Sequence, residues 1–220
     1  MALTVLRDLR PLFGPARDQD PRPTCLAFAA SDAHAAARGL PFDPLSAEWA
    51  YYHAVRRDGG KPDGGATLGG MLDGIRLDGQ PVEAAWPYTN GPNPDPATWA
   101  PPPGVTALFR RDSATQPACS VGDVVAPLGA GSPVLLVMTI SDGFYLPSPD
   151  GIVAAVEPPD PERVHAVLAV GHGTLGGSAE AILVRNSWGP EWGEDGHAWL
   201  HEAYLAPRLL RSAVMTKEFA

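Results

Sequence analysis

Two apolar runs in the C-terminal half constrain the fold of this chain more than any other feature of its sequence. Residues 164–173 and 181–185 are rich in valine, leucine, isoleucine and alanine. Short runs with β-branched residues predict buried β-strands. His165 lies near the start of the first run, and Asn186 directly follows the second. If the two strands pair antiparallel, the start of one meets the end of the other, so we expect the imidazole and the amide to lie side by side.

The segment that begins at the end of the second run is rich in tryptophan and glycine and has two interpretations. Residues 185–199 read Arg-Asn-Ser-Trp-Gly-Pro-Glu-Trp-Gly-Glu-Asp-Gly-His-Ala-Trp. In one interpretation, the carbonyl of Asn186 accepts a hydrogen bond from a histidine and the ring of Trp188 keeps water away. In the other, the segment is a turn between strands whose glycines supply positive φ angles. The segment by itself favours neither.

A cysteine at the start of a predicted helix favours the first interpretation. Pro23 and Thr24 are typical of a helix entry, the run after them is rich in alanine, and Gly39 is a natural stop. Cys25 therefore lies in the first helical turn, where the helix dipole and free backbone N–H groups lower the pKa of a thiol. A histidine held against this thiol would accept its proton and leave a thiolate–imidazolium pair that can attack a carbonyl carbon.

The order and spacing of these residues resemble those of the papain-like cysteine peptidases. His165 follows Cys25 by 140 positions, within the range for this family. The matching positions are Gln19, Cys25 with Ala27 and Phe28, His165 at the start of its strand, and Asn186-Ser187-Trp188-Gly189.

The resemblance implies a role for each of these residues. Cys25 would be the nucleophile, His165 the general base and acid, and Asn186 the residue that orients the imidazole, with Trp188 shielding their hydrogen bond. Gln19 would donate its amide to the oxyanion, which acyl transfer needs in any case. The alternative for Gln19 is an ordinary exposed loop residue, since aspartates flank it on both sides.

Gly64 and Gly65 occupy the place where the family carries paired glycines. There the backbone forms an extended edge that binds the substrate chain by strand-like pairing. The alternative is a flexible turn before the helix predicted at residues 68–75, because Gly-Gly is common in loops.

Phe144 and Val164 are the other candidates for substrate contact. Phe144 lies in a turn predicted at 142–145, after a buried strand predicted at 132–140, and the family often places pocket walls there. The alternative for Phe144 is a core aromatic residue. Val164 precedes His165 where many relatives carry Asn or Asp, so the catalytic pair loses a polar neighbour.

The resemblance implies an α+β fold of the papain type, with residues 1–220 forming one domain. We expect a helical lobe from about residue 12 to 110 and an antiparallel, β-barrel-like lobe from about 111 to 206. The active site would lie in the cleft between the lobes, and the terminal segments would cross to the opposite lobe. Ser46 predicts the cap of a second helix, and the prolines between 92 and 103 predict an irregular surface connector.

Charge and hydropathy exclude several partners. The formal net charge is −9 and no run of Lys or Arg occurs, which argues against binding to nucleic acid or to an anionic membrane. Residues 1–20 lack the apolar core of a signal peptide, and no stretch approaches the roughly 20 apolar residues of a membrane-spanning helix. We expect a cytoplasmic protein that acts on a peptide or protein substrate, with export by a route without a signal peptide left open.

Cys25 and Cys119 are the two cysteines of the chain. If Cys25 is the nucleophile, Cys119 has no intrachain partner, so we expect a bacterial-type, disulfide-free member in a reducing compartment. The family usually carries a long helical propeptide, whereas 24 residues precede Cys25 here. Unless the sequence starts at the mature end, we expect restraint through narrow specificity, a regulatory protein partner or physical confinement.

We expect neither a cofactor nor a metal. His197 and His201 lie four residues apart on a predicted strand, where a metal could bridge them, but no third ligand closes the pattern. The glycine-rich segment after residue 64 lacks the Gly-Lys-Ser/Thr of a phosphate-binding loop. The Gly-x-Ser-x-Gly elbow of a serine hydrolase is also missing.

These observations predict a cysteine-type peptidase that hydrolyses peptide bonds through an acyl-enzyme on Cys25. One alternative is a catalytically silent relative that binds peptides or a partner, because a fold does not guarantee chemistry. The other is a transpeptidase or ligase that transfers the same acyl group to an amine. The filled catalytic positions favour an enzyme, and the sequence does not separate hydrolysis from ligation.

Overall fold

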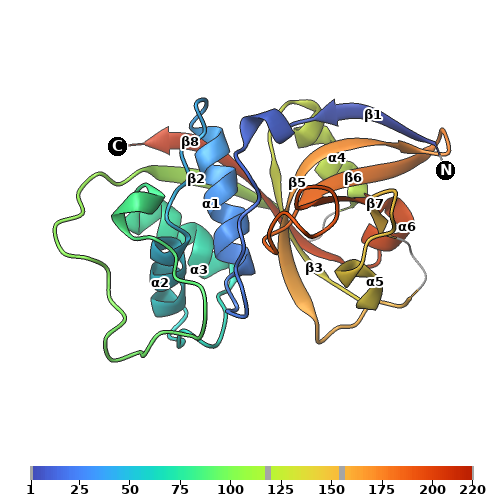
Figure 1. Ribbon diagram of the computed structural model, residues 1–220. Coiled ribbons are helices and arrows are strands. Elements are labelled where there is room, and N and C mark those ends of the chain that lie inside the picture. The colour runs from blue at the N-terminus through green and yellow to red at the C-terminus, as the bar shows by residue number, and fades with distance from the viewer. Residues whose placement is uncertain (1, 117–119, 154–156, 220) are drawn as a thin grey trace.

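A helical lobe and a large β-sheet lie side by side in the computed structural model, which describes residues 2–116, 120–153 and 157–219 (Figure 1). The described helices are α1 (Cys25–Ala37), α2 (Ala47–Arg57), α3 (Leu68–Asp73), α4 (Val121–Gly129), α5 (Asp142–Tyr145) and α6 (Glu202–Leu205), with a π-helical turn at Gly74–Asp78 and 3₁₀ turns at Arg10–Leu12 and Glu83–Ala85. The described strands are β1 (Leu3–Asp8), β2 (Arg110–Gln116), β3 (Val134–Thr139), β4 (Ile152–Val153), β5 (Val164–Leu175), β6 (Ala179–Arg185), β7 (His197–His201) and β8 (Leu209–Phe219).

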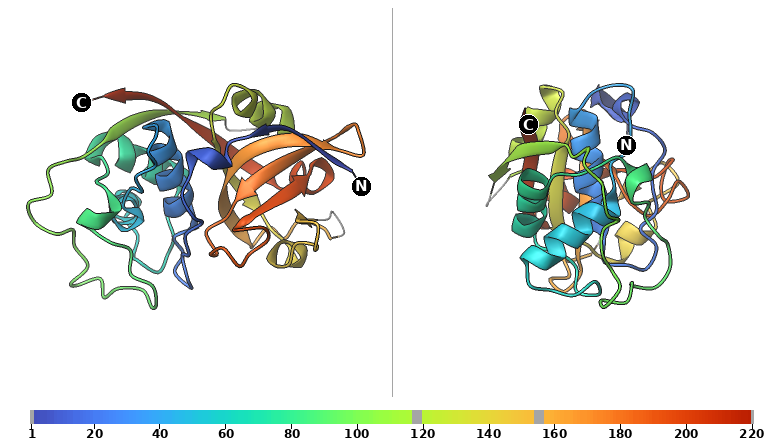
Figure 2. Two further views of the ribbon diagram at one scale, coloured as in Figure 1. Left: turned by 45° about the horizontal axis from the view of Figure 1, so that its top comes forward. Right: turned by 90° about the vertical axis from the view of Figure 1, so that its left-hand side faces the viewer.

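The strands form one sheet in the order β2-β8-β3-β5-β6-β7-β4, and β1 also pairs with β5. Every pairing is antiparallel except that of β4 with β7. The α+β class is therefore confirmed, but the expected barrel-like closure is wrong. Among the described residues the sheet stays open, because β2 and β4 lie at its opposite ends. The ribbon of β2 and β8 runs from the sheet across the helical lobe instead (Figures 1 and 2).

Each end of the chain crosses from one lobe to the other. β1 precedes the helices yet pairs with β5 of the sheet, and the end of β8 lies beside the helical lobe (Figure 2). The chain thus ties the two lobes together at both ends.

The helix that carries Cys25 is buried along almost its whole length, because it lies between the sheet and the helices α2 and α3. Every side chain from Leu26 to Ala36 is buried. Small alanine side chains let neighbouring elements approach closely, so the composition that predicts the helix also suits its central position. His34, a buried polar residue of α1, shares a hydrogen bond of 3.0 Å with Gln80.

Local signals place the other elements with some differences. Ser46 caps α2 by accepting a hydrogen bond from the backbone N–H of Trp49 at 3.0 Å, as predicted. The turn predicted at residues 142–145 is instead the short helix α5, which Asp142 begins with an acidic side chain in the first turn. The helix predicted at 68–75 ends as α3 at Asp73 and continues as a π-helical turn.

Cys25 is a free thiol in the described part of the chain. The prediction that Cys119 has no intrachain partner concerns a residue outside the described ranges. No described helix is both long and apolar enough to span a membrane.

A buried ion pair stabilises the helical lobe. The guanidinium of Arg22 donates to both carboxylate oxygens of Glu48, at 2.7 and 2.8 Å. Trp99 Nε1 donates to the same carboxylate at 2.7 Å, and Arg22 also reaches the carbonyl of Thr89 at 3.1 Å. These contacts join the segment before α1, the helix α2 and the proline-rich connector.

Replacing Glu48 by glutamine should lower the free energy of unfolding by about 3–5 kcal/mol, because the buried Arg22 charge loses its counter-charge. Urea unfolding followed by circular dichroism measures the loss. Asp73→Asn is the control, since Asp73 and Arg76 pair with side chains 55% and 43% exposed. Such surface pairs contribute less than about 1 kcal/mol. Equal losses in the two variants would contradict a structural role for the buried pair.

Candidate active site

Cys25 begins α1, and its half-buried side chain lies where the helical lobe meets β5. Burial acts to raise the pKa of the Cys25 thiol, but several nearby groups outweigh it. The hydrogen bond and charge of His165 favour the thiolate, and so do the backbone N–H groups of Ala166 and Leu26. The pKa of this thiol is therefore held below its usual value.

His165 lies at the start of β5, and Asn186 directly follows β6, which pairs antiparallel with β5. The distance between His165 Nε2 and Asn186 Oδ1 is 2.8 Å, so the expected contact between imidazole and amide is confirmed. Because a carbonyl oxygen only accepts, Nε2 carries the proton. The other ring nitrogen, Nδ1, is then left to accept the proton of the Cys25 thiol.

Aromatic rings surround this hydrogen bond. The ring of Trp188 lies 4.8 Å from the ring of His165, and the ring of Phe144 lies 5.7 Å from it at a steep angle. Tyr145 stacks on Trp188 at 5.1 Å. Water is thus kept away from His165 and Asn186, both of which are buried.

The tryptophan- and glycine-rich segment after β6 is both a tight turn and a support for the site. Gly193 and Gly196 have φ angles of +61° and +80°. A Cβ atom on Gly196 would lie 2.2 Å from Ala16 Cβ, so only glycine fits. The two interpretations that the sequence left open describe two parts of the same segment.

Gln19 is buried beside this segment and is not an exposed loop residue. Its backbone N–H donates to the carbonyl of Ser187 at 2.8 Å, and its side-chain oxygen accepts from Ser187 Oγ at 2.7 Å. Its side-chain nitrogen donates to the carbonyl of Arg22 at 2.8 Å. An amide nitrogen carries two hydrogens, so a second N–H is left to contact a ligand. Ser187 is thus a further residue of the site, and no local sequence signal predicts its contact with Gln19.

A cleft of about 620 Å³ opens beside Cys25 and His165. Gly64, Gly65 and Val164 line it, as expected of residues that contact a substrate. Phe144 does not line it, because its side chain is fully buried behind His165 and Trp188. Phe144 is therefore a core aromatic residue that supports the imidazole, and the expectation that it forms a pocket wall is wrong.

The other walls of the cleft come from residues that the sequence did not predict as substrate contacts. Leu68, Val137 and Ala166 give it apolar sides. Asp58 lies at its rim, with its carboxylate accepting hydrogen bonds from the backbone N–H and the hydroxyl of Thr67, both at 2.7 Å. These residues belong to four different elements or loops, so no local sequence pattern predicts that they line one cleft.

His197 and His201 have separate tasks. His197 is buried and its Nδ1 pairs with the carbonyl of Asp195 at 2.8 Å. Burial, with the charge of Arg185, lowers the pKa of His197 to about 4. His201 caps α6 by accepting from the N–H of Ala203 at 3.0 Å. In the ranges that the structure describes, no group of three or more His, Cys, Asp and Glu residues could hold a metal ion.

Sequence comparison identifies the second half of the chain. The model of the papain family cysteine proteases matches residues 107–210, which include His165 and Asn186. A cysteine protease of Blomia tropicalis is 30% identical over 82 residues, 37% of this chain and 24% of that protein. Papaya proteinase 4 of Carica papaya is 54% identical over 39 residues, 18% of this chain and 11% of that protein. The matched part thus spans at most about a quarter of these relatives.

Comparison with solved structures covers nearly the whole chain. Xylellain, a cysteine protease from Xylella fastidiosa, superimposes with a TM-score of 0.74 at 22% identity over 98% of this chain and 87% of that one. The digestive procathepsin L 3 of Tenebrio molitor gives 0.77 at 19% identity over 99% and 71%. At these identities the likeness establishes the fold. The family match and the shared fold both support a papain-like cysteine peptidase.

Proposed function

We propose that this protein is a cysteine peptidase that hydrolyses peptide bonds with Cys25 as nucleophile. The observation that carries the proposal is the chain of contacts from the Cys25 thiol to His165 and on to Asn186, at the edge of a cleft large enough for several residues of a peptide. A thiol at a helix N-terminus against an oriented imidazole is the arrangement that activates a sulfur nucleophile.

In the proposed reaction, the Cys25 sulfur attacks the carbonyl carbon of the scissile bond after its proton has passed to His165 Nδ1. The second N–H of Gln19 and the backbone N–H of Cys25 donate to the oxygen that becomes negative. His165 then gives the proton to the leaving amine as the C–N bond breaks. Water, deprotonated by the same imidazole, hydrolyses the thioester and frees the acid and the thiol.

The cleft favours an extended peptide as substrate. The backbone at Gly64 and Gly65 offers an edge for strand-like pairing, which does not depend on the peptide's side chains. The apolar walls formed by Leu68, Val137 and Val164 favour an apolar side chain near the scissile bond. An amine that competes with water for the thioester would give ligation from the same intermediate.

Replacing Cys25 by alanine should abolish peptide turnover, whereas Asn186→Ala should lower kcat by about 10²-fold and leave the thiol reactive, because only the orientation of the imidazole is lost. Turnover of a fluorogenic peptide library and alkylation by iodoacetamide measure the two effects. Equal damage from both substitutions would mean that the roles are wrongly assigned.

The same assay separates the alternatives. Mass spectrometry of the products, with and without an added amine, distinguishes hydrolysis from acyl transfer. If wild-type protein turns over no peptide although Cys25 alkylates faster than free cysteine, the peptidase proposal is lost and a silent peptide-binding protein takes its place.

Replacing His165 by alanine should move the pH profile of Cys25 alkylation to higher pH. The lowered pKa of this thiol depends on the hydrogen bond and charge of His165, and thiolate predominates only above the thiol pKa. The shift is measured by alkylation with iodoacetamide at pH values from about 4 to about 10, because thiols in proteins titrate within this range. The matched control is His201→Ala, a histidine that caps α6. A profile that stays in place in His165→Ala would exclude His165 as the partner of the thiol.

Replacing Gln19 by alanine should lower kcat/KM by about 10²–10³-fold, the effect of losing one oxyanion donor. Alkylation by iodoacetamide forms no oxyanion, so its rate should stay unchanged in the same variant. A parallel fall in both rates would show that Gln19 acts by holding the site in shape through Ser187 and not by contacting the substrate.

A further inference from the structure

A second buried carboxylate lies on the helix that carries Cys25. Asp32 follows Cys25 by two turns of α1, so the two side chains share one face of the helix about 10 Å apart along its axis. The side chain of Asp32 is buried, with a relative exposure of 6%. One carboxylate oxygen accepts from Arg17 at 2.7 Å, and the other accepts from Arg185 Nε at 2.8 Å.

Arg185 connects this carboxylate to the catalytic loop. It is the last residue of β6 and directly precedes Asn186. Its other guanidinium nitrogens donate to the carbonyls of Gly14 and Pro15, at 3.0 and 2.7 Å. Each nitrogen of the guanidinium therefore has a partner, and the backbone at the start of the Asn186 loop is fixed against both α1 and the N-terminal segment.

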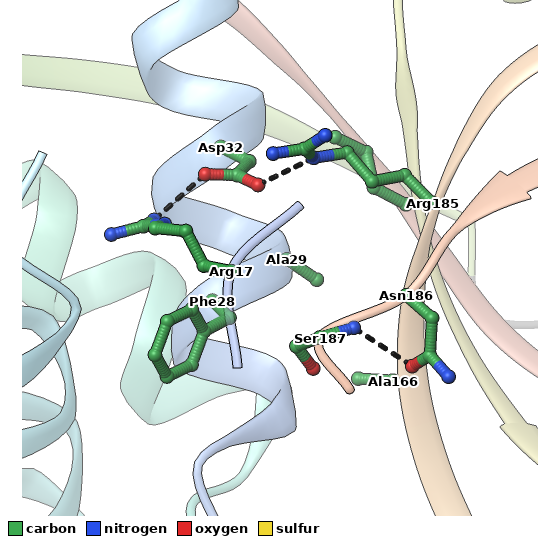
Figure 3. Close-up of a pocket in the computed structure, with 9 residues that line it drawn as sticks. Arg17, Phe28, Ala29, Asp32, Ala166, Arg185, Asn186 and Ser187 are labelled. Carbon is green, nitrogen blue, oxygen red and sulfur yellow. Dashed lines mark hydrogen bonds and ion pairs between the residues drawn. The ribbon is translucent and has the colours of Figure 1, made fainter. Parts of the chain in front are cut away.

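The same residues enclose a small cavity behind the site (Figure 3). Its volume is about 10 Å³, room for no more than one water molecule. Figure 3 shows the Asp32 carboxylate between Arg17 and Arg185, with Asn186 and Ser187 on the other side of the cavity. With so little free space, a displacement of Arg185 would be transmitted to Asn186.

Net stabilisation by attraction between the charges does not by itself explain why this buried network is present. Burial acts to raise the pKa of Asp32, but the charges of Arg17 and Arg185 outweigh it and hold the pKa below its usual value, so the carboxylate stays ionised. Removing three charges from water costs much of what their attraction returns, and apolar residues can stabilise a core as well. The directional hydrogen bonds of a planar guanidinium do, however, fix the relative positions of the groups that they join, and apolar contacts fix such positions less well.

We infer that Asp32 is a positioning residue: through Arg185 it holds Asn186, and with it His165, at the distance from Cys25 that proton transfer needs. Cys25 comes from the helical lobe while His165 and Asn186 come from the sheet, so this distance depends on how the lobes are aligned. The kinetic part of the inference rests on the proposed peptidase function, whereas the thiol part does not.

The test compares Asp32→Asn with Glu48→Gln. Glu48 belongs to a buried ion pair that lies wholly within the helical lobe, so both variants leave a buried arginine charge uncompensated but only one affects the contact between lobes. Asp32→Asn should lower kcat by about 10- to 100-fold with KM changed by less than about threefold, as expected from misplaced catalytic groups. Glu48→Gln, compared at equal folded fraction, should leave both constants near wild type.

The pH profile of Cys25 alkylation gives a second readout that needs no substrate turnover. The titratable groups that line the cleft with Cys25 are His165 and, at the rim, Asp58, and both stay unchanged in these variants. A weaker contact with His165 should move the profile of Asp32→Asn to higher pH, while that of Glu48→Gln stays in place. Because this readout uses only the thiol, it tests the inference even if the wild type hydrolyses no peptide.

Arg185→Lys keeps the charge but loses the fork, and it serves as the second variant if Asp32→Asn does not fold. It should show a smaller fall in kcat and a smaller shift of the same sign. The inference is overturned if the folded variant of either position alkylates with the wild-type pH profile. It is equally overturned if Asp32→Asn and Glu48→Gln lose kcat to the same extent.

Discussion

The arrangement of this molecule depends on one contact, that between the N-terminus of α1 and the start of β5. The Cys25 thiol and the His165 imidazole meet there, although each comes from a different lobe. Neither lobe holds the whole proposed catalytic set, so the chemistry is possible only while the lobes are aligned. The burial of α1 between the sheet and the other helices provides that alignment, because a closely packed helix has few alternative positions.

The residues of the candidate site that the sequence could predict are those fixed by local signals. A helix entry places Cys25, and the ends of two apolar strands place His165 and Asn186, so the main contacts follow from the pattern of elements. Phe144 shows where this reasoning fails. An aromatic residue after a strand has the same local signature whether it lines a cleft or packs behind a histidine, and only the tertiary fold decides. The open sheet was equally hidden, since the direction that β2 and β8 take depends on packing against the helical lobe.

Buried charge has two different tasks in this fold. Arg22 and Glu48 join the segment before α1 to α2 within the helical lobe. Asp32 and Arg185 join the helical lobe to the sheet. Losing one partner of a buried pair is costly even where the pair itself adds little net stability. Both pairs therefore favour one arrangement of their surroundings over others, the first within a lobe and the second between lobes.

The loop after β6 contacts both the imidazole and the oxyanion donor of the proposed mechanism. Asn186 holds the imidazole, while the next residue, Ser187, holds the amide of Gln19 through its hydroxyl and its carbonyl. The segment around Gln19 also pairs with the loop where Gly189 N–H donates to the carbonyl of Arg17 at 3.1 Å. The orientation of the proposed general base and the position of the proposed oxyanion donor are thus set by neighbouring residues of one loop. Because Arg185 fixes the start of this loop and Arg17 contacts both the loop and Asp32, a displacement of the lobes would disturb both functions together.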